Sequence, residues 1–412
     1  MKQFCAVLAF CLLFAYPAAA SDPFSIRTSL SYPQNFVPVA IPAQMGETLA
    51  FSSEDLERRL GIAHGSLEGI TLTALPDRSS GAVLLDGVEA EAYDYLTRAE
   101  VDRLCFRPEP GAAFAVVTFV PRGGAPVTAS LQISILQQIA PPPEIEGISL
   151  ETLRNIPISG YIPVTDHGSG GVAVRVVRQP QKGLVRISDQ SFIYEPFSGI
   201  TGRDIFTVLA VDSSGSLSQE AAVSVSIGKT RTDFSYADMT GHPSHYAAIQ
   251  LHNHGVMSGR KIGDTWLFDP DTQMSRANFL ILAVTAAGLR VSPTVNTGLE
   301  NDASIPIWLK PYVKAGLDAG MISPNYGFNF RGVPTRAEAV LMTERAANIR
   351  DVKDFAITVT DRGDIPDWAQ ASYKNLTAHR MLGIHDGRAA PNAALTNSYA
   401  AELAWQLYSR RK

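Results

Sequence analysis

Hydrophobic and polar positions alternate along the first half of the chain and then change to a helical spacing. From about Phe36 to Leu136, short alternating runs such as "AAFAVVTFVPRGG" and "TASLQISIL" are broken by Gly and Pro, which is typical of antiparallel strands. Residues 137–147, "QQIAPPPEIEG", indicate a stiff proline linker. A second strand-rich zone follows from about Ile148 to Ile227. The pattern predicts two all-β units, over residues 21–137 and 138–228.

The two strand-rich zones resemble each other. Phe106-Arg107-Pro108 and Tyr194-Glu195-Pro196 lie 88 residues apart, and the zones end in the similar strands "ASLQISI" and "AAVSVSI". That period suits a small sandwich, so we expect tandem β-sandwiches. The alternative is that two unrelated all-β units share such patterns.

The chain beyond about residue 229 has helical patterning with an internal repeat. "RANFLILAVTAAG", "RAEAVLMTERAAN" and "AAELAWQLYSR" place apolar residues at three- and four-residue intervals, which predicts amphipathic helices. Ser275-Arg276 is matched 60 residues later by Thr335-Arg336, and Thr396 lies 61 residues further on. We therefore expect three repeats, over 229–290, 291–351 and 352–412.

Composition adds an export signal and an uneven charge. Residues 1–20, "MKQFCAVLAFCLLFAYPAAA", have the charge, apolar run and small-residue end of a cleaved signal peptide, with a retained membrane anchor as the alternative. Cleavage leaves Cys105 as the one cysteine, so no internal disulfide is expected. Residues 21–233 carry 16 Lys and Arg against 24 Asp and Glu (16 − 24 = −8), and residues 234–412 carry 18 against 16 (18 − 16 = +2). This balance argues against a nucleic-acid partner.

The three repeats carry a recognisable order of residues. An Asp precedes a helix that an aromatic residue opens, a Gly ends that helix, and a loop leads to Ser/Thr-Arg and a second helix. The acidic residues are Asp238, Asp302 and Asp361, and the aromatic residues are Tyr246, Trp308 and Trp368. The repeats resemble S-layer homology motifs, and the strand-rich zones resemble, more loosely, the cadherin-like and immunoglobulin-like repeats of bacterial surface proteins.

The resemblance implies a fold, a ligand and a set of site residues. In that family three motifs close into an all-α, pseudo-threefold unit whose grooves bind secondary cell-wall polysaccharide, often with anionic pyruvylated sugars. Ser275 and Thr335 are expected to cap their helices, and Glu338 to complete a capping box. Exposed helix N–H groups would then favour an anion, and Arg276 or Arg336 would contact its carboxylate. Tyr246, Trp308 and Trp368 are candidates to cover sugar faces, with a core role as the alternative.

Two departures from the family pattern rank the grooves. Copy three has Asn397 in the arginine position, and copy one has Asn278 in the acidic position. We expect Arg336 to be the strongest contact, Arg276 the second, and the third groove to be weak or structural. For Arg336 the alternative is a surface arginine that pairs with a neighbouring carboxylate.

The letters of Thr335–Glu338 also occur at Thr97–Glu100, between strand-like runs. That earlier copy lacks the aromatic-led helix and the 60-residue register. It is expected to cap one short helical turn and nothing more.

Other chemistries were weighed and set aside. His242, His245, His252 and His254 are close in sequence, but their spacing matches no zinc motif. Asp166, Asp204 and Asp212 lack a dense calcium loop, so roles in turns and at strand edges are favoured. "HGSGG", residues 167–171, lacks a nucleophile-elbow context. The sequence therefore predicts no metal, no cofactor and no enzymatic activity.

Together these patterns predict an exported, cell-surface protein held non-covalently to wall polysaccharide or a peptidoglycan-linked glycan. Two alternatives remain open at this point. One is a structural S-layer or envelope protein whose sandwiches contact other surface proteins, and the other is an adhesin whose sandwich loops bind another cell.

Overall fold

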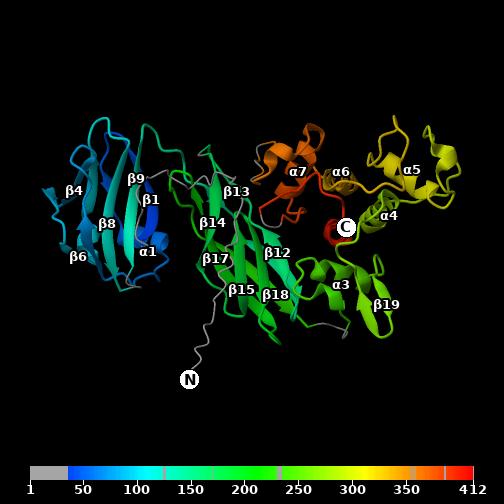
Figure 1. Cartoon of the computed structure of the whole chain (residues 1–412), viewed down its shortest axis with the longest axis horizontal. Helices are drawn as coiled ribbons and strands as arrows, with labels where there is room; N and C mark the ends of the chain where they lie inside the picture. Colours follow the sequence, from blue (N-terminus) through cyan, green and yellow to red (C-terminus); the bar gives the residue numbers. More distant parts are fainter. Residues whose placement is uncertain are drawn as a thin grey trace, which may run out of the picture.

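The chain folds as two β units and one helical unit arranged in a row (Figure 1). The structure is a computed structural model that describes residues 36–123, 127–168, 170–229, 234–353, 355, 357, 359–384 and 387–411. The predicted signal peptide, residues 1–20, lies outside the described residues. Within those residues, every helix is too short or too polar to cross a membrane.

The first β unit is a sandwich of two sheets. One sheet has the order β1-β9-β8-β3-β6 and the other the order β2-β7-β4-β5. The strands are β1 (Phe36–Gln44), β2 (Leu49–Ala50), β3 (Gly69–Ala74), β4 (Gly81–Leu85), β5 (Val88–Glu89), β6 (Tyr95–Thr97), β7 (Leu104–Pro108), β8 (Phe114–Arg122) and β9 (Thr128–Leu136). Two helices, α1 (Ser53–Leu60) and α2 (Arg98–Val101), complete it. Alternate residues of β8 and β9 are buried, because successive side chains of a strand point to opposite faces.

The second β unit is also a sandwich, with sheet orders β11-β18-β17-β14 and β12-β16-β15 and a small β10-β13 pair. Its strands are β10 (Glu144–Ile145), β11 (Ile148–Leu153), β12 (Ile158–Tyr161), β13 (Val164–Thr165), β14 (Val172–Arg178), β15 (Gly183–Ser188), β16 (Ser191–Pro196), β17 (Gly202–Asp212) and β18 (Ala221–Gly228). Phe192, Tyr194 and Phe206 pack together in its core.

The two sandwiches have corresponding topologies. In each, the first strand pairs in parallel with the last, as β1 with β9 and β11 with β18. The last strand then pairs antiparallel with the strand before it, as β9 with β8 and β18 with β17. Phe106 on β7 and Tyr194 on β16 occupy matching central strands and are fully buried. The correspondence agrees with the tandem arrangement that the sequence predicts.

The helical unit contains three helix pairs, each preceded by a short 3₁₀ turn. The turns are η1 (Ala237–Met239), η2 (Asp302–Ser304) and η3 (Arg362–Asp364). The first helices of the pairs are α3 (His245–Asn253), α5 (Lys310–Asp318) and α7 (Asp367–Ala378), and the second helices are α4 (Arg276–Ala287), α6 (Arg336–Ala347) and α8 (Asn397–Ser409). A hairpin of β19 (Arg260–Ile262) and β20 (Thr265–Leu267) follows α3.

The second sandwich contributes two buried residues to the hydrophobic core of the helical unit. Ile156 and Tyr161, on either side of the start of β12, belong to the same buried cluster as the helices, with 5% and 6% of their surface exposed. The second sandwich also has a separate core of its own, and these two residues extend the core of the helical unit across the sequence boundary near residue 228. The two sandwiches meet through Arg59, whose Nη1 donates to the carbonyls of Ala40 and Gly215, both at 2.5 Å.

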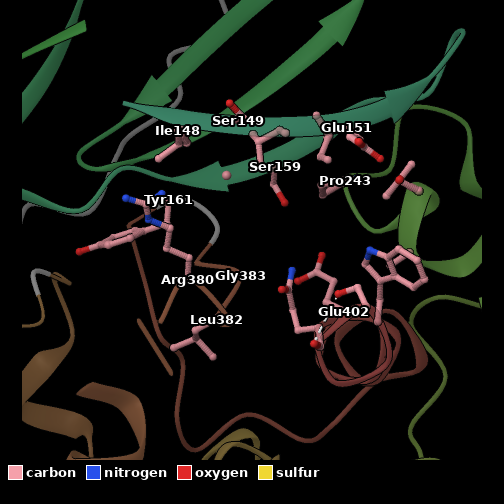
Figure 2. A pocket seen from close by; sticks show the side chains of 18 of the residues that line it. Ile148, Ser149, Glu151, Ser159, Tyr161, Pro243, Arg380, Leu382, Gly383 and Glu402 are labelled. Atoms are coloured by element: carbon pink, nitrogen blue, oxygen red, sulfur yellow. Dashed lines mark hydrogen bonds between the residues drawn. The ribbon is translucent and has the colours of Figure 1, made fainter. Parts of the chain in front are cut away.

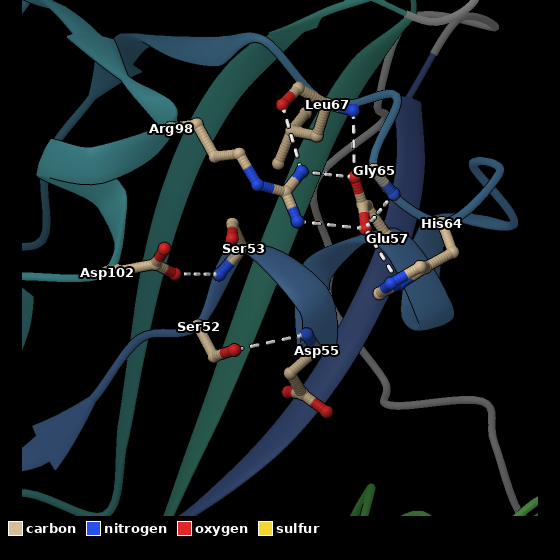
Figure 3. Close-up of polar contacts among 9 residues, drawn as sticks. All are labelled: Ser52, Ser53, Asp55, Glu57, His64, Gly65, Leu67, Arg98 and Asp102. Atoms are coloured by element: carbon tan, nitrogen blue, oxygen red, sulfur yellow. Dashed lines mark hydrogen bonds and ion pairs between the residues drawn. The ribbon is translucent and has the colours of Figure 1, made fainter.

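The earlier copy of the repeated letters is indeed a cap. Glu100 accepts hydrogen bonds from the Thr97 amide and hydroxyl, at 2.8 and 2.7 Å, at the start of the four-residue α2. Arg98 from the same stretch reaches the buried carboxylate of Glu57 on α1 (Figure 3). The predicted capping role of Thr97–Glu100 is confirmed, and the sequence did not foresee the buried ion pair.

Candidate functional site

The helical unit is closed by a cyclic set of backbone hydrogen bonds at the start of its second helices. The first amide of α4, Arg276 N–H, donates to Gly332 O at 2.7 Å in the loop before α6. Arg336 N–H at the start of α6 donates to Ala393 O at 2.8 Å, in the loop before α8. Asn397 N–H at the start of α8 donates to Thr272 O at 2.9 Å, in the loop before α4.

The second backbone amide of α4, α6 and α8 also donates to a carbonyl in the loop of another repeat. The third amide donates to the side-chain hydroxyl of the residue that caps the helix. Ala277, Ala337 and Ser398 donate to the carbonyls of Phe330, Pro391 and Pro270. Ser275, Thr335 and Thr396 accept from the amides of Asn278, Glu338 and Tyr399, so the predicted caps are present. The expectation that exposed helix N–H groups favour an anion is therefore wrong, because backbone carbonyls and cap hydroxyls already accept from them. Side chains must supply any contact with an anion.

Each repeat places its Arg-position residue against the Glu-position residue of the next repeat. In the first groove, between α4 and α6, Arg276 Nη2 lies 2.7 Å from both carboxylate oxygens of Glu338. Its Nη1 donates to Asn329 O at 3.1 Å. Glu338 also accepts from the Thr335 amide at 2.8 Å, which completes the predicted capping box. Arg276 is thus neutralised inside the molecule.

The second groove, between α6 and α8, has an aromatic residue where the first has a carboxylate. The Arg336 guanidinium lies 4.5 Å from the centre of the Tyr399 ring, a cation–π contact. Within the described part of the chain no carboxylate forms an ion pair with Arg336, and its buried Nε has no hydrogen-bond partner. Arg336 therefore lies against an aromatic ring and has no ion-pair partner among the described residues.

Two tyrosines beside Arg336 add polar groups that the described residues leave unsatisfied. The hydroxyls of Tyr373 and Tyr399 are buried and have no hydrogen-bond partner there. Burial raises the pKa of both tyrosines, to a level well above the ordinary value for Tyr399. Both side chains therefore stay protonated donors at neutral pH. Buried polar groups without partners are uncommon in folded proteins, so this cluster is a candidate contact point.

The third groove, between α8 and α4, contains a cavity of about 440 Å³. Asn278 and Asn397 line it with Phe268 and Asp269 from the hairpin loop. The Asn397 amide nitrogen also donates to the carbonyl of Asp269 at 3.1 Å. Arg260 at its rim donates to both carboxylate oxygens of Asp269, at 2.5 and 2.9 Å, and this contact lowers the pKa of Asp269. The cavity is therefore near neutral, with a lining that mixes apolar side chains and a few polar groups.

The three predicted aromatic residues do not share one environment. Trp308 and Trp368 are 61% and 53% exposed, whereas Tyr246 is only 9% exposed and packs edge-on against Trp405. The two tryptophans are thus exposed to solvent, while Tyr246 is mostly buried. Tyr373, Tyr399 and Arg260 are site candidates that the sequence analysis did not name.

Asp238, Asp302 and Asp361 were expected to be equivalent in the three repeats, and for Asp302 this expectation is wrong. Asp238 and Asp361 each accept from two successive amides of the following loop, for example Phe268 and Asp269 in the first repeat. In the second repeat Asn301, not Asp302, has this role and accepts from the Phe328 amide at 2.9 Å. Asp302 instead pairs with Lys310 at 2.6 Å, which lowers its pKa to about 2.

The histidines near α3 have structural contacts. Burial lowers the pKa of His245 to about 4, and its Nε2 lies 3.1 Å from Ser235 Oγ. His252 stacks on Phe234 with ring centres 3.7 Å apart. Among the described residues no group of three or more His, Cys, Asp or Glu is arranged to hold a metal ion.

No protein-family model matches the chain. No curated protein matches it.

Among solved structures, the chain is similar to an endo-fucoidan hydrolase of glycoside hydrolase family 107, at 14% identity over 49% of this chain and 31% of that one, with a TM-score of 0.19. It is similar to the fibronectin(III)-like modules of Clostridium thermocellum CbhA, at 12% identity over 48% and 94% of the two chains, with a TM-score of 0.20. Drosophila N-cadherin EC1-3 gives 11% identity over 48% and 65%, with a TM-score of 0.21. The chain thus spans about a third of the family 107 protein.

Proposed function

We propose that this is an exported surface protein whose helical unit binds an anionic cell-wall polysaccharide non-covalently and displays two β-sandwiches. The observation that carries the proposal is the contrast between the two arginine grooves. Arg276 is held by Glu338, whereas Arg336 lies over Tyr399 with no carboxylate partner among the described residues. An exposed anionic substituent would supply the missing partner of Arg336.

The cyclic closure supports the resemblance to S-layer homology motifs. Three helix starts each donate to the loop of the next repeat and close the unit cyclically, and each junction has its own chemistry. This arrangement fits a pseudo-threefold unit that engages several sugar residues. Because the contacts lie in one unit, two modest grooves raise the apparent affinity through effective concentration.

The groove chemistries suggest a division of labour. Arg336 would contact the acidic group, with a bidentate geometry that suits a carboxylate. The neutral cavity lined by Asn278 and Asn397 would take an uncharged sugar. This assigns the third groove a larger role than the sequence analysis expected. The exposed ring of Trp368 or Trp308 offers an apolar surface for a sugar face.

The test is co-sedimentation of the mature chain, residues 21–412, with wall sacculi of the source organism. It is run with and without acid extraction of the secondary polymer, and with Arg336→Ala. The matched control is Arg290→Ala, because Arg290 is an exposed arginine just after α4. The complete chain is needed because Ile156 and Tyr161 complete the helical core.

Binding that is lost on extraction and falls at least tenfold in Arg336→Ala but not in Arg290→Ala would support the proposal. Binding that survives extraction would reject the secondary polymer as the ligand in favour of peptidoglycan. Absence of binding to either preparation would refute the anchoring function.

A further inference from the structure

A separate cavity lies at the junction of the second sandwich and the helical unit. Its volume is about 440 Å³, and it is enclosed by β11 and β12 on one side and by α3, α8 and the turn after α7 on the other (Figure 2). This size lies within the range of about 300–1000 Å³ that is usual for ligand pockets, and such pockets favour domain interfaces. It shares no lining residue with the cavity between α8 and α4.

The sandwich side of this junction cavity consists of two strand edges. β11 and β12 are each the last strand of their sheets, so each has one side that pairs with no other strand of the sandwich. Four consecutive residues of each strand, 148–151 and 158–161, line the cavity. Because successive side chains point to opposite faces, such consecutive lining means that the strand edges face the cavity. An edge strand presents backbone N–H and C=O groups that can form hydrogen bonds with a ligand.

The helical side supplies aromatic and charged groups. Tyr246 and Trp405 contribute ring surface, and Glu402 contributes a carboxylate that accepts from Ser244 Oγ at 2.6 Å. The formal charges of the lining balance, because two arginines, Arg380 and Arg410, face two glutamates, Glu151 and Glu402. A balanced site gives no advantage to a ligand with net charge.

Arg380 provides an independent observation. It has a left-handed backbone, with φ of 57°, at the position after α7 where the other two repeats have glycine. Gly255 follows α3 with φ of 66°, and Gly320 follows α5 with φ of 71°. A side chain in this conformation costs free energy that glycine avoids. Residues kept in such conformations cluster at functional sites.

The ion pair that Arg380 forms does not explain why an arginine stands at this position. Its Nη2 lies 3.0 Å from Glu146 Oε2, but Glu146 is 82% exposed. Exposed pairs of this kind contribute little to stability. The lining of the junction cavity therefore accounts better for an arginine here.

We propose that the junction cavity binds a neutral saccharide that contacts the second sandwich and the helical unit at once. Donors and acceptors come from both strand edges and from three helical segments, which suits a ring with hydroxyls on all sides. An extended peptide would use one strand edge only. The aromatic and aliphatic lining suits the C–H face of a sugar. The site involves none of the groove residues, so it stands whether or not the helical unit anchors the chain.

The experiment is calorimetric titration of the mature chain with the neutral trisaccharides chitotriose, cellotriose, maltotriose and mannotriose. At least one is expected to bind the wild type at millimolar or lower concentration. Arg380→Gly is expected to weaken this binding at least tenfold while Tm stays unchanged or rises by up to about 3 °C. Glu402→Gln should weaken binding with the fold preserved, which covers the case that Arg380→Gly alters the junction.

Three control variants separate the junction cavity from the surface ion pair and from the grooves of the helical unit. Glu146→Gln removes the exposed ion pair and should leave saccharide binding unchanged. Arg336→Ala and Asn278→Ala alter the grooves of the helical unit, and the binding that Arg380→Gly removes should remain in both variants.

The proposal is overturned if no trisaccharide binds, or if Arg380→Gly and Glu402→Gln bind as the wild type does. It is also overturned if Asn278→Ala removes the binding, or if the cavity takes an unstructured peptide in preference to every saccharide. Loss of sacculus binding in Arg336→Ala with intact trisaccharide binding would leave the two proposals independently supported.

Discussion

Arg276 and Glu338 are 62 residues apart in the chain, yet one guanidinium nitrogen lies 2.7 Å from both carboxylate oxygens. They occupy the Arg and Glu positions of successive repeats. The next pair in the same relation is Arg336 and Tyr399, in which the carboxylate is replaced by a ring. The residue that faces each arginine therefore decides whether its charge is available to a ligand.

Replacing Glu338 by glutamine should make Arg276 available. Glutamine preserves the capping box with Thr335 and removes the negative charge. We expect severalfold tighter binding of an acidic wall polymer, measured by co-sedimentation. The double variant Glu338→Gln/Arg276→Ala should return to wild-type affinity. If Glu338→Gln alone binds no better than the wild type, the first groove is not a ligand site.

Removal of either unsatisfied tyrosine hydroxyl should not destabilise the helical unit. Tyr373→Phe and Tyr399→Phe remove buried hydroxyls that have no partner in the described part of the chain. Such a change is neutral or stabilises by up to about 1 kcal/mol, because a desolvation cost disappears. Urea unfolding followed by hydrogen exchange in α7 and α8 measures it. A loss of more than about 1 kcal/mol would reveal an ordered partner.

The first sandwich should lose stability in acid through Glu57. The hydrogen bond from Arg98 lowers the Glu57 pKa from 4.5 to about 2, and burial opposes this effect (Figure 3). A carboxyl whose pKa is lower in the folded chain stabilises it above pH 4.5, and this contribution is lost as pH falls from 4.5 toward 2. Glu57→Gln should cost about 3 kcal/mol at neutral pH and remove this part of the pH dependence.

Hydrogen exchange at the amides of α1 and β3 between pH 7 and pH 2 checks this prediction. The matched control is Glu89→Gln, because Glu89 lies at the surface, 4.0 Å from Arg78. The control should change stability by less than about 0.5 kcal/mol. Equal effects of the two substitutions would show that the Glu57–Arg98 pair has no special role.

A change at Ile156 of the second sandwich should weaken the helices, because this residue belongs to the core of the helical unit. Ile156→Ala should destabilise the helical unit by about 2–5 kcal/mol, because it opens a cavity among residues of that core. Faster hydrogen exchange in α3 and α8 would show this. Ile205→Ala on β17 is the control, since Ile205 is 45% exposed. Unchanged exchange in Ile156→Ala would mean that the units fold separately.

The repeats and the capping chemistry could be predicted because they depend on local signals. Alternation specified the strands, the 60-residue period located the helix pairs, and Ser275 and Thr335 cap as a hydroxyl at that position does. The sequence could not predict that the first amides of α4, α6 and α8 already donate hydrogen bonds, because the carbonyls that accept them belong to another repeat. Carbonyls such as Gly332 O and Ala393 O carry no side-chain signal.

The sequence could predict the environment of Arg276 and of Arg336 only in part. Tyr399 stands in the position that corresponds to Glu338, so the repeat register could have shown that Arg336 faces a ring. The junction cavity could not be predicted from the sequence, because it depends on how two units lie relative to each other. The sequence shows an arginine at position 380 where the other two repeats have glycine. Only the backbone angle shows that this arginine has a left-handed conformation.

The parallel pairing of first and last strands has a mechanical consequence. In each sandwich the chain enters at one end and leaves at the other, because β1 runs beside β9 and β11 beside β18 in the same direction. Tension between the chain ends would load these pairs in shear along their length. All ladder hydrogen bonds of a pair then resist together instead of opening one after another. A chain of this topology that is held at its carboxyl-terminal unit and pulled at its other end would thus behave as a stiff, force-bearing tether.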